Sequence, residues 1–290
     1  MVDTDQPDLP DGSQPTAVQP SLERMKRFDI RPKRKLGQNF LVDNNILELI
    51  AVAAHLKPTD TVLEIGGGLG VLSEYLAARA AHVHVIEIDK TLEPALEDAL
   101  APHANTSLHF ADAVNFDLAA LDPLPNKLIA NLPYGVAASA LIKSFEELDQ
   151  LELACVMAQR EVAQRLAAAP RSKLYGATSV LIQLRCDVLS QRRLSRNIFY
   201  PVPNVDSSLI VLQRQRPNPG QDVIDLVHNA FAHRRKPLAG SVAIAGAGGA
   251  ARRDQIAAVM EAIGLNPKAR AEELSPDDFL RLAQGLQTDG

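Results

Sequence analysis

The chain has 290 residues, of which 46% are hydrophobic and 22% charged, as is usual for a globular protein. This length has room for one large and one small domain. No uncharged apolar run approaches the roughly 18 residues of a membrane span, and the net charge of −5 gives no overall support to nucleic-acid binding, although the cations are clustered. The acidic, proline-rich N-terminus lacks the basic-then-apolar order of a secretory signal. We therefore expect a cytoplasmic protein without a membrane partner.

The two cysteines, Cys155 and Cys186, each lie in an apolar segment. Their spacing and the absence of neighbouring histidines favour small buried residues over a zinc site or a disulfide framework, so we expect no metal. No set of Ser, His and Asp, or of Cys and His, stands out as a nucleophilic site. Covalent catalysis is therefore not expected.

The N-terminal region combines a polar tail with a basic run. Residues 1–20 carry Asp, Pro, Gln, Gly and Ser with almost no apolar content, which predicts a disordered tail, and we place the end of this tail at residue 30. The run RPKRK at residues 31–35 is either a solvated face or an arm that contacts phosphates. Apolar residues at helical spacing then predict a helix over residues 44–56.

A strand, a glycine run and a helix follow one another next. Residues 61–65 are β-type, GGGLG occupies residues 66–70, and residues 71–80 have helical spacing. This order lets the backbone approach a nucleotide closely, although the G-x-G-x-G spacing is weak support by itself. A second strand over residues 83–89 contains Glu87, about 20 residues after the glycine run, where an acidic side chain meets ribose hydroxyls.

Two further strand ends supply polar groups. A third strand over residues 107–110 is followed by Asp112, and a fourth over residues 127–130 leads into the sequence NLPY. In this sequence the Asn131 side-chain oxygen and the Leu132 carbonyl can accept hydrogen bonds from an exocyclic amine, while Pro133 stiffens the turn and Tyr134 can stack on a base. The alternative is an ordinary strand-ending turn, with the two carboxylates as helix caps or surface groups. Because strand ends of an open α/β sheet share one edge, where ligands bind, the ordered set predicts a nucleotide-type site.

The following segment is expected to complete the sheet. Strands are predicted over residues 149–157, 186–194 and 207–212, with a polar-faced helix over residues 159–166. Prolines exclude a regular helix or central strand between the last two strands, so Phe199 and Tyr200 are expected on a rigid loop. There they either stack on an extruded base or pack into the core.

A linker is expected at residues 217–220, followed by helices over residues 223–232, 252–263 and 276–284. The Gly/Ala-rich stretch 238–251 lacks a helical stripe and is expected to be mobile. Clustered cations suited to phosphates occur in three places along the chain. The candidates for these phosphate contacts are Lys33, Arg34, Lys35, Arg192, Arg193, Arg234, Arg235 and Lys236.

An ordered series of motifs resembles one family, the KsgA-type ribosomal RNA adenine N6,N6-dimethyltransferases. The resemblance runs from about Lys33 to about Leu280, and the glycine at position 67 stands where proline or alanine is commoner. The motifs are KLGQNFLVD at 35–43, VLEIGGGLG at 62–70, Glu87, Asp112, NLPY at 131–134, MAQREVAQRL at 157–166, KLYGATSV at 173–180, FYPVPNVDSS at 199–208 and FAHRRK at 231–236.

The resemblance implies an α/β fold: a Rossmann-like, seven-stranded S-adenosylmethionine-dependent methyltransferase domain over residues 31–216, and a small all-helical RNA-binding domain over residues 217–290. Glu87 would bind the ribose hydroxyls of the cofactor S-adenosylmethionine, and Asp112 its adenine amine. The residues implied for the cofactor are Asn39, Leu41, Gly66, Gly68, Glu87, Asp112 and Asn131. Those implied for the target base and catalysis are Asn131, Leu132, Pro133, Tyr134 and Phe199.

The substrate that the resemblance implies is a pair of adjacent adenosines in the 3′-terminal hairpin loop of 16S rRNA, dimethylated at N6 within the small subunit or its precursor. One rival is the related resistance methyltransferase that modifies large-subunit rRNA; the FAHRRK and KLYGATSV segments favour the small-subunit enzyme. Another is a non-catalytic assembly factor. No DNA-recognition domain is visible, so DNA is not an expected partner. A monomer is expected because no exposed apolar stripe stands out.

Overall fold

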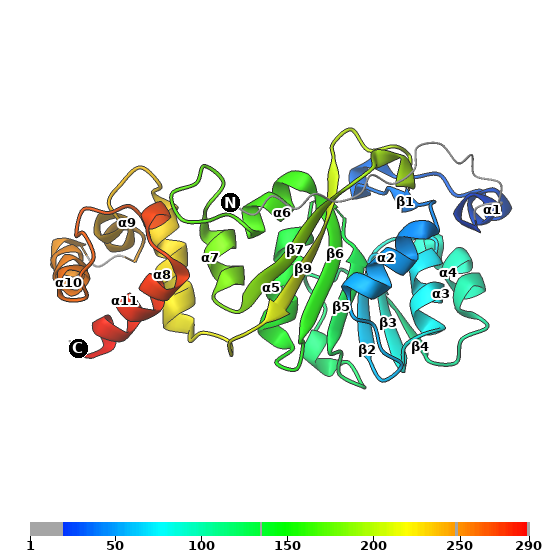
Figure 1. Ribbon diagram of the computed structural model, residues 1–290, viewed down its shortest axis with the longest axis horizontal. Helices are drawn as coiled ribbons and strands as arrows, with labels where there is room; N and C mark the ends of the chain where they lie inside the picture. The colour runs from blue at the N-terminus through cyan, green and yellow to red at the C-terminus, as the bar shows by residue number, and fades with distance from the viewer. Residues whose placement is uncertain (1–19, 134, 247–248, 289–290) are drawn as a thin grey trace.

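The computed structural model describes residues 20–133, 135–246 and 249–288. Its larger unit contains a seven-stranded sheet in the order β4-β3-β2-β5-β6-β9-β7 (Figure 1). Strands β2 to β6 are parallel, whereas β9 is antiparallel to both of its neighbours. This order confirms the Rossmann-like α/β prediction. The strands are β2 (Thr61–Ile65), β3 (His82–Glu87), β4 (Thr106–Phe110), β5 (Lys127–Asn131), β6 (Leu153–Gln159), β7 (Cys186–Leu194) and β9 (Ser207–Arg214).

Helices cover both faces of the sheet, which explains why its strands have continuous apolar sequences. Val62 and Val85 belong to a core that includes residues of α2 (Asn45–Ala53), α3 (Val71–Ala77) and α4 (Glu93–Leu100). On the other face, Leu63 and Leu128 pack with Phe145 of α5 (Ala137–Glu147). Both cysteines are buried and free, as predicted.

The strand order reverses beside β2, which has β3 on one side and β5 on the other. Ligands of open α/β sheets bind at such a point, beyond the carboxyl ends of the strands. The glycine run follows β2 and Asn131 ends β5, so the predicted motifs lie on the two sides of this point.

The prediction of a disordered tail over residues 1–30 is wrong for residues 20–27, since Pro20–Arg27 forms helix α1. Met25, Phe28 and Ile30 pack against the core that α2, α3 and α4 share, so these apolar side chains stabilise the segment. Residues 1–19 lie outside the described chain. Apolar spacing over 25–30 was the signal that the polar composition of the region concealed.

The prediction that Phe199 and Tyr200 lie on a rigid loop is also corrected. They form β8 (Phe199–Tyr200), which pairs antiparallel with β1 (Phe40–Leu41), and are not purely a loop. Phe199 is only 2% exposed and belongs to a core cluster, whereas Tyr200 is 46% exposed. This two-residue ladder joins the segment before α2 to the segment between β7 and β9.

The C-terminal unit is helical, as predicted (Figure 1). The stretch 238–251 was expected to be mobile and without a helix, but it contains α9 and the start of α10; residues 247 and 248 lie outside the described chain. α9 has no amphipathic stripe because its exposed side is apolar too: Leu238, Ala239, Val242 and Ala243 are buried, whereas Ile244 is 53% exposed. The helices are α8 (Gln221–Ala232), α9 (Leu238–Ala245), α10 (Gly249–Ala262) and α11 (Pro276–Thr288).

The two units share a core. Tyr175, Leu181 and Leu184, which precede the expected linker, are buried together with Val227 and Phe279 of the C-terminal helices. The connecting helices are α6 (Arg160–Leu166) and α7 (Ala177–Gln183).

Short 3₁₀ helices occupy Arg34–Leu36, Lys90–Leu92, Leu118–Ala120, Arg196–Ile198 and Ala271–Glu273. Within the described ranges, the structure has no helix long and apolar enough to cross a bilayer.

Candidate active site

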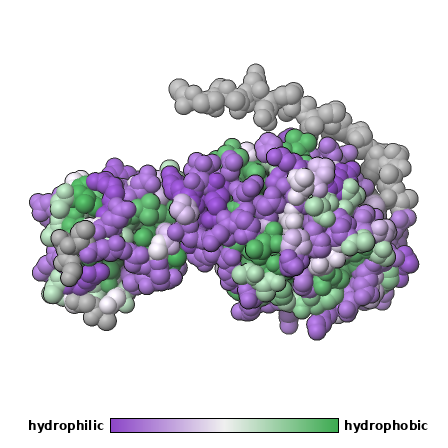
Figure 2. All heavy atoms as spheres, turned by 90° about the horizontal axis from the view of Figure 1, so that it is seen from below, coloured by the Kyte–Doolittle hydropathy of each residue, from purple (hydrophilic) through white to green (hydrophobic). Residues whose placement is uncertain are grey.

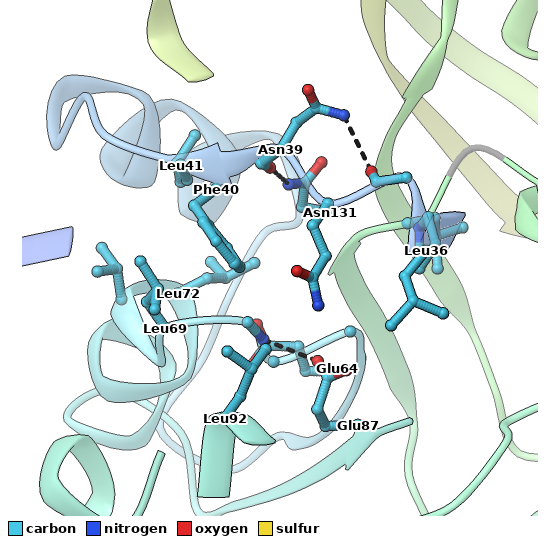
Figure 3. A pocket seen from close by; sticks show the side chains of 18 of the residues that line it. Leu36, Asn39, Phe40, Leu41, Glu64, Leu69, Leu72, Glu87, Leu92 and Asn131 are labelled. Carbon is cyan, nitrogen blue, oxygen red and sulfur yellow. Dashed lines mark hydrogen bonds between the residues drawn. The ribbon is translucent and has the colours of Figure 1, made fainter. Parts of the chain in front are cut away.

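A cavity opens at the carboxyl ends of β2, β3 and β5 (Figure 3). It brings together residues from the segment before α2, from the glycine run and from the strand ends. Most residues that the sequence assigned to a cofactor line it: Asn39, Leu41, Gly66, Gly68, Glu87 and Asn131.

The glycine run lets other groups approach its backbone closely. Gly66 and Gly68 have φ angles of +86° and +59°, in the left-handed region. A Cβ atom at Gly66 would lie 3.3 Å from Pro133 Cδ, and one at Gly68 would lie 3.3 Å from Phe40 Cδ1. Side chains at these positions would strain the turn and crowd the cavity.

Glu87 is 5% exposed and is held by two backbone amides. Its Oε2 accepts a hydrogen bond from Gly68 N at 3.0 Å, and its Oε1 accepts one from Asp89 N at 2.9 Å. Burial raises the pKa of Glu87 above its ordinary value, and these hydrogen bonds partly counteract the rise. The carboxylate is therefore tied directly to the glycine loop.

Glu64 is a cavity residue that the sequence analysis missed. It lies on β2 before the glycine run, is 1% exposed, and its Oε2 has no hydrogen-bond partner among the described residues. Burial, together with the nearby charge of Glu87, raises the pKa of Glu64 to about 8. An acidic residue inside an otherwise apolar strand, directly before a glycine run, was the signal in the sequence.

Asn131 has a fixed amide orientation. Its Nδ2 donates to the Asn39 carbonyl oxygen at 3.1 Å, which leaves Oδ1 as an acceptor at the cavity (Figure 3). Leu132 is 1% exposed and its N–H donates to Met157 O at 3.0 Å, so the backbone beside Asn131 is also held. Tyr134, the last residue of NLPY, lies outside the described residues.

Asp112 lines a second cavity, which shares Gly66, Glu87 and Pro133 with the first. Its carboxylate accepts hydrogen bonds from Val114 N at 3.0 Å and Asn115 Nδ2 at 2.8 Å. The two cavities together form one continuous edge from Asn131 to Asp112. Phe199 lines neither of them.

The predicted RNA-contact cations have different surroundings. Lys33 Nζ donates to Asp89 Oδ1 at 2.7 Å, Arg193 pairs with Asp206 at 3.0 Å, and Arg234 pairs with Glu272 at 3.0 Å. These three are engaged within the protein. The others are exposed and form no ion pair with any residue that the structure describes: Arg34, Lys35, Arg192, Arg235 and Lys236.

The Lys33 contact fastens the basic segment to the site. Gln38 Nε2 donates to the other carboxylate oxygen of Asp89 at 2.7 Å. Burial would raise the pKa of Asp89, but hydrogen bonds from Lys33, Thr91 and Gln38 outweigh it and lower the pKa to about 2. The carboxylate is thus charged at every ordinary pH, and the segment containing Asn39 is held beside the first cavity.

Comparisons with known proteins match the chain to one family. The model of a family described as ribosomal RNA adenine dimethylase matches residues 30–288. Proteins named ribosomal RNA small subunit methyltransferase A are similar over most of their length. The one from Rubrobacter xylanophilus is 43% identical, covering 87% of this chain and 94% of its own, and the one from Thermobifida fusca is 40% identical, covering 89% and 91%.

Two solved structures share the fold. A dimethyladenosine transferase from Plasmodium falciparum has a TM-score of 0.72 at 24% identity, covering 84% of this chain and 95% of its own. The 23S rRNA methyltransferase ErmE has a TM-score of 0.61 at 28% identity, covering 86% and 100%.

Proposed function

The chain belongs to the ribosomal RNA adenine dimethylase family, and from this premise we propose that it dimethylates N6 of two adjacent adenosines in the 3′-terminal hairpin loop of 16S rRNA. The similarity to small-subunit methyltransferases over about nine-tenths of both chains supports this substrate. The observation that supports the chemistry is the hydrogen bond from Asn131 to Asn39, which orients the Asn131 amide so that its Oδ1 is left as one of the two acceptors at NLPY.

The family uses S-adenosylmethionine, and the residues present fit this cofactor. Glu87 would hold ribose hydroxyls, Asp112 the adenine amine, and the glycine run leaves room for a ligand against its backbone. The unpartnered Oε2 of Glu64 offers a buried acceptor for a cationic group. When bound, S-adenosylmethionine supplies a methyl group on a positively charged sulfur.

The protein's own contribution is positioning. The adenine N6 amine is a poor nucleophile because its lone pair is delocalised into the ring. Asn131 Oδ1 and the Leu132 carbonyl would accept hydrogen bonds from its two N–H groups, draw the nitrogen toward tetrahedral geometry and aim its lone pair. In each transfer the nitrogen–methyl bond would form as the sulfur–methyl bond breaks, and the amine would release one proton to solvent. After one transfer a single N–H remains, so one of these contacts must be given up for the second. No strong general base is required.

Base stacking by Tyr134 and Phe199 is also part of the proposal. Stacking contributes about 1–3 kcal/mol per base and would offset the few kcal/mol that unstacking costs. Because Phe199 is buried, it could stack only after the β1–β8 ladder or its surroundings shift.

We also propose a monomer that acts in the cytoplasm. In Figure 2 the hydrophobic residues of the visible face form separate patches among hydrophilic ones, which supports the monomer.

The test is methyl transfer from labelled S-adenosylmethionine to small ribosomal subunits that lack the modification, with naked large-subunit rRNA as the comparator. Dimethyladenosine on the small subunits alone, identified by mass spectrometry of nucleosides, is the expected result. Label on large-subunit RNA would favour the alternative function, methylation of large-subunit rRNA, which the similarity to ErmE suggests. Binding without any transfer would indicate an assembly factor instead.

A further inference from the structure

We propose that helix α1 is part of the cofactor site, and that Arg24 is a positioning residue that holds the glycine loop in its binding conformation. This inference rests on the proposed use of S-adenosylmethionine. α1 ends at Arg27, before residue 30, where the family match begins. The proposed role therefore belongs to a segment outside the matched residues.

Arg24 connects the glycine loop to two helices. Its Nη1 donates to the carbonyl oxygen of Leu69 at 3.2 Å, and its Nη2 donates to Glu74 Oε2 of α3 at 2.7 Å. Its Nε lies 3.5 Å from Asp98 Oδ2 of α4. The Arg24 side chain is only 12% exposed, so these contacts are largely shielded from water.

Leu69 is the point where support of this loop is most needed. It lies between Gly68 and Gly70, both of which have positive φ angles. Glycines have no side chains to anchor such a turn and keep wide conformational freedom. The amide of Gly68 binds Glu87, so movement at Leu69 would also move the carboxylate assigned to the ribose.

The N-terminal end of α1 reaches the cavity itself. Ser21 is 1% exposed and lines the same cavity as Glu87 and Asn131. Its hydroxyl donates to the carbonyl oxygen of Leu41, another residue of the cavity wall. α1 thus contacts the glycine loop through Arg24 and the β1 segment through Ser21, and it contributes Ser21 to the wall of the cavity.

Arg27 provides a matched control on the same helix. It is 66% exposed, pairs with Asp98 at 2.7 Å, and has no hydrogen bond to the glycine loop. Replacing either arginine removes a cation and an ion pair to α4. Only the Arg24 replacement removes the hydrogen bond to Leu69, and it also removes the ion pair with Glu74 of α3.

The experiment compares Arg24→Ala, Arg27→Ala and wild type by calorimetric titration with S-adenosylhomocysteine, by thermal unfolding without ligand, and by steady-state methyl transfer. We expect Arg24→Ala to raise the dissociation constant, and the KM for S-adenosylmethionine, about tenfold, as loss of a charge-assisted hydrogen bond does. kcat at saturating cofactor should stay within about twofold of wild type. Arg27→Ala should leave both constants within about twofold.

Ser21→Ala supplies a second variant in case Arg24→Ala does not fold, and it should raise the dissociation constant about threefold. If either folded variant loses thermal stability while binding and KM remain at wild-type values, α1 is structural only and the inference is overturned. Equal losses of affinity in Arg24→Ala and Arg27→Ala would overturn it too. If the wild type itself binds no S-adenosylhomocysteine, the proposed cofactor use fails before α1 is tested.

Discussion

At the scale of single residues, Asn131 combines two roles through the two ends of one amide. Its Nδ2 is committed to Asn39 O, so Oδ1 is left to face the cavity. We expect Asn131→Ala to lower kcat by about 10²–10³, as removal of a single preorganised polar group from an active site does. Single-turnover methylation of small subunits would measure the loss. Retained subunit binding is the control, and a loss below tenfold would contradict a direct role.

Glu64 is predicted to make stability depend on pH. Its pKa is raised to about 8 in the folded protein, against 4.5 for an ordinary glutamate. The folded state therefore keeps a proton that the unfolded state releases. The resulting stabilisation is fully present below pH 4.5 and is lost as the pH rises through about 8.

Glu64→Gln should remove this dependence and leave the ligand-free protein relatively more stable at pH 9. The slope that it removes is at most about 1.4 kcal/mol per pH unit. Urea unfolding from pH 5 to pH 9 measures it, with Glu97→Gln on the exposed face of α4 as the control. Parallel profiles for wild type and Glu64→Gln would show that the carboxyl is not held neutral.

At the scale of elements, the contact between the glycine run and β3 has no spare space. A Cβ at Gly67 would lie 2.5 Å from Val85 Cγ1 and 3.0 Å from Leu96 Cδ2. The glycine at this position is thus matched to the valine beneath it. We expect Gly67→Ala to destabilise the protein by about 1–3 kcal/mol through overpacking.

Val85→Ala should also destabilise the protein, because it leaves a cavity under the glycine run. The double variant should lose less free energy of unfolding than the sum of the two single variants, by about 1 kcal/mol or more. The reason is that the methyl group added at residue 67 would occupy the space that Val85→Ala leaves. Urea denaturation of all four proteins measures this coupling. Additive losses would mean that the loop avoids the clash by moving elsewhere.

The elements that the sequence predicted well are those whose pattern comes from one local cause. Strands buried on both faces produce apolar runs, and the order from β2 through the glycine run to α3 follows from turn chemistry. α9 failed the same reasoning because its exposed Ile244 is as apolar as its buried residues and its polar Ser241 is buried, which leaves no stripe. α1 failed because its apolar contacts are few and lie among charges.

The site residues also divide into those that a local pattern predicts and those that depend on tertiary neighbours. Glu87, Asp112 and Asn131 follow from strand ends, whose positions an open α/β sheet determines. Whether a cation is free depends on tertiary neighbours, so the sequence could not show that Lys33 is paired with Asp89. Burial of Phe199 depends on the β1–β8 pairing, which joins segments about 160 residues apart in the chain and has no local signature.

At the scale of the whole molecule, exposed cations lie on both units. Arg235 and Lys236 follow α8, while Arg34, Lys35 and Arg192 belong to the larger unit. We expect the double variant Arg235→Ala/Lys236→Ala to weaken binding to small-subunit RNA and to lower the slope of log affinity against log salt by about 1–2. Filter binding between 50 and 200 mM salt, roughly the range in which counterion release is resolved, would measure it.

Arg234→Ala is the contrast to this pair. Arg234 is bonded to Glu272 and to the carbonyl oxygens of Lys173 and Tyr175, so its loss should lower stability more than the salt slope. An unchanged slope in the Arg235→Ala/Lys236→Ala variant would reject this part of the RNA-contact assignment. The larger unit would then have to supply the phosphate contacts alone.

The two units are joined by more than a linker. Arg185 is fully buried and donates to Glu146 Oε1, Asn218 Oδ1 and Leu181 O, at 2.8, 2.8 and 2.7 Å. These bonds tie the linker to α5 and α7. The boundary placed at residue 217 therefore divides the chain, but it does not divide the core that Tyr175 and Leu181 share with the C-terminal helices.

We accordingly expect the units to unfold together in one calorimetric transition, with equal calorimetric and van't Hoff enthalpies. Tyr175 tests this, since its buried hydroxyl donates to Leu274 O at 2.8 Å across the shared core. Tyr175→Phe removes that bond and should cost about 1–3 kcal/mol, because Leu274 O loses a buried donor. The whole transition should move to lower temperature. Two transitions, of which only the one belonging to the helical unit shifts, would show that the C-terminal unit folds independently and that its contact with α7 is weak.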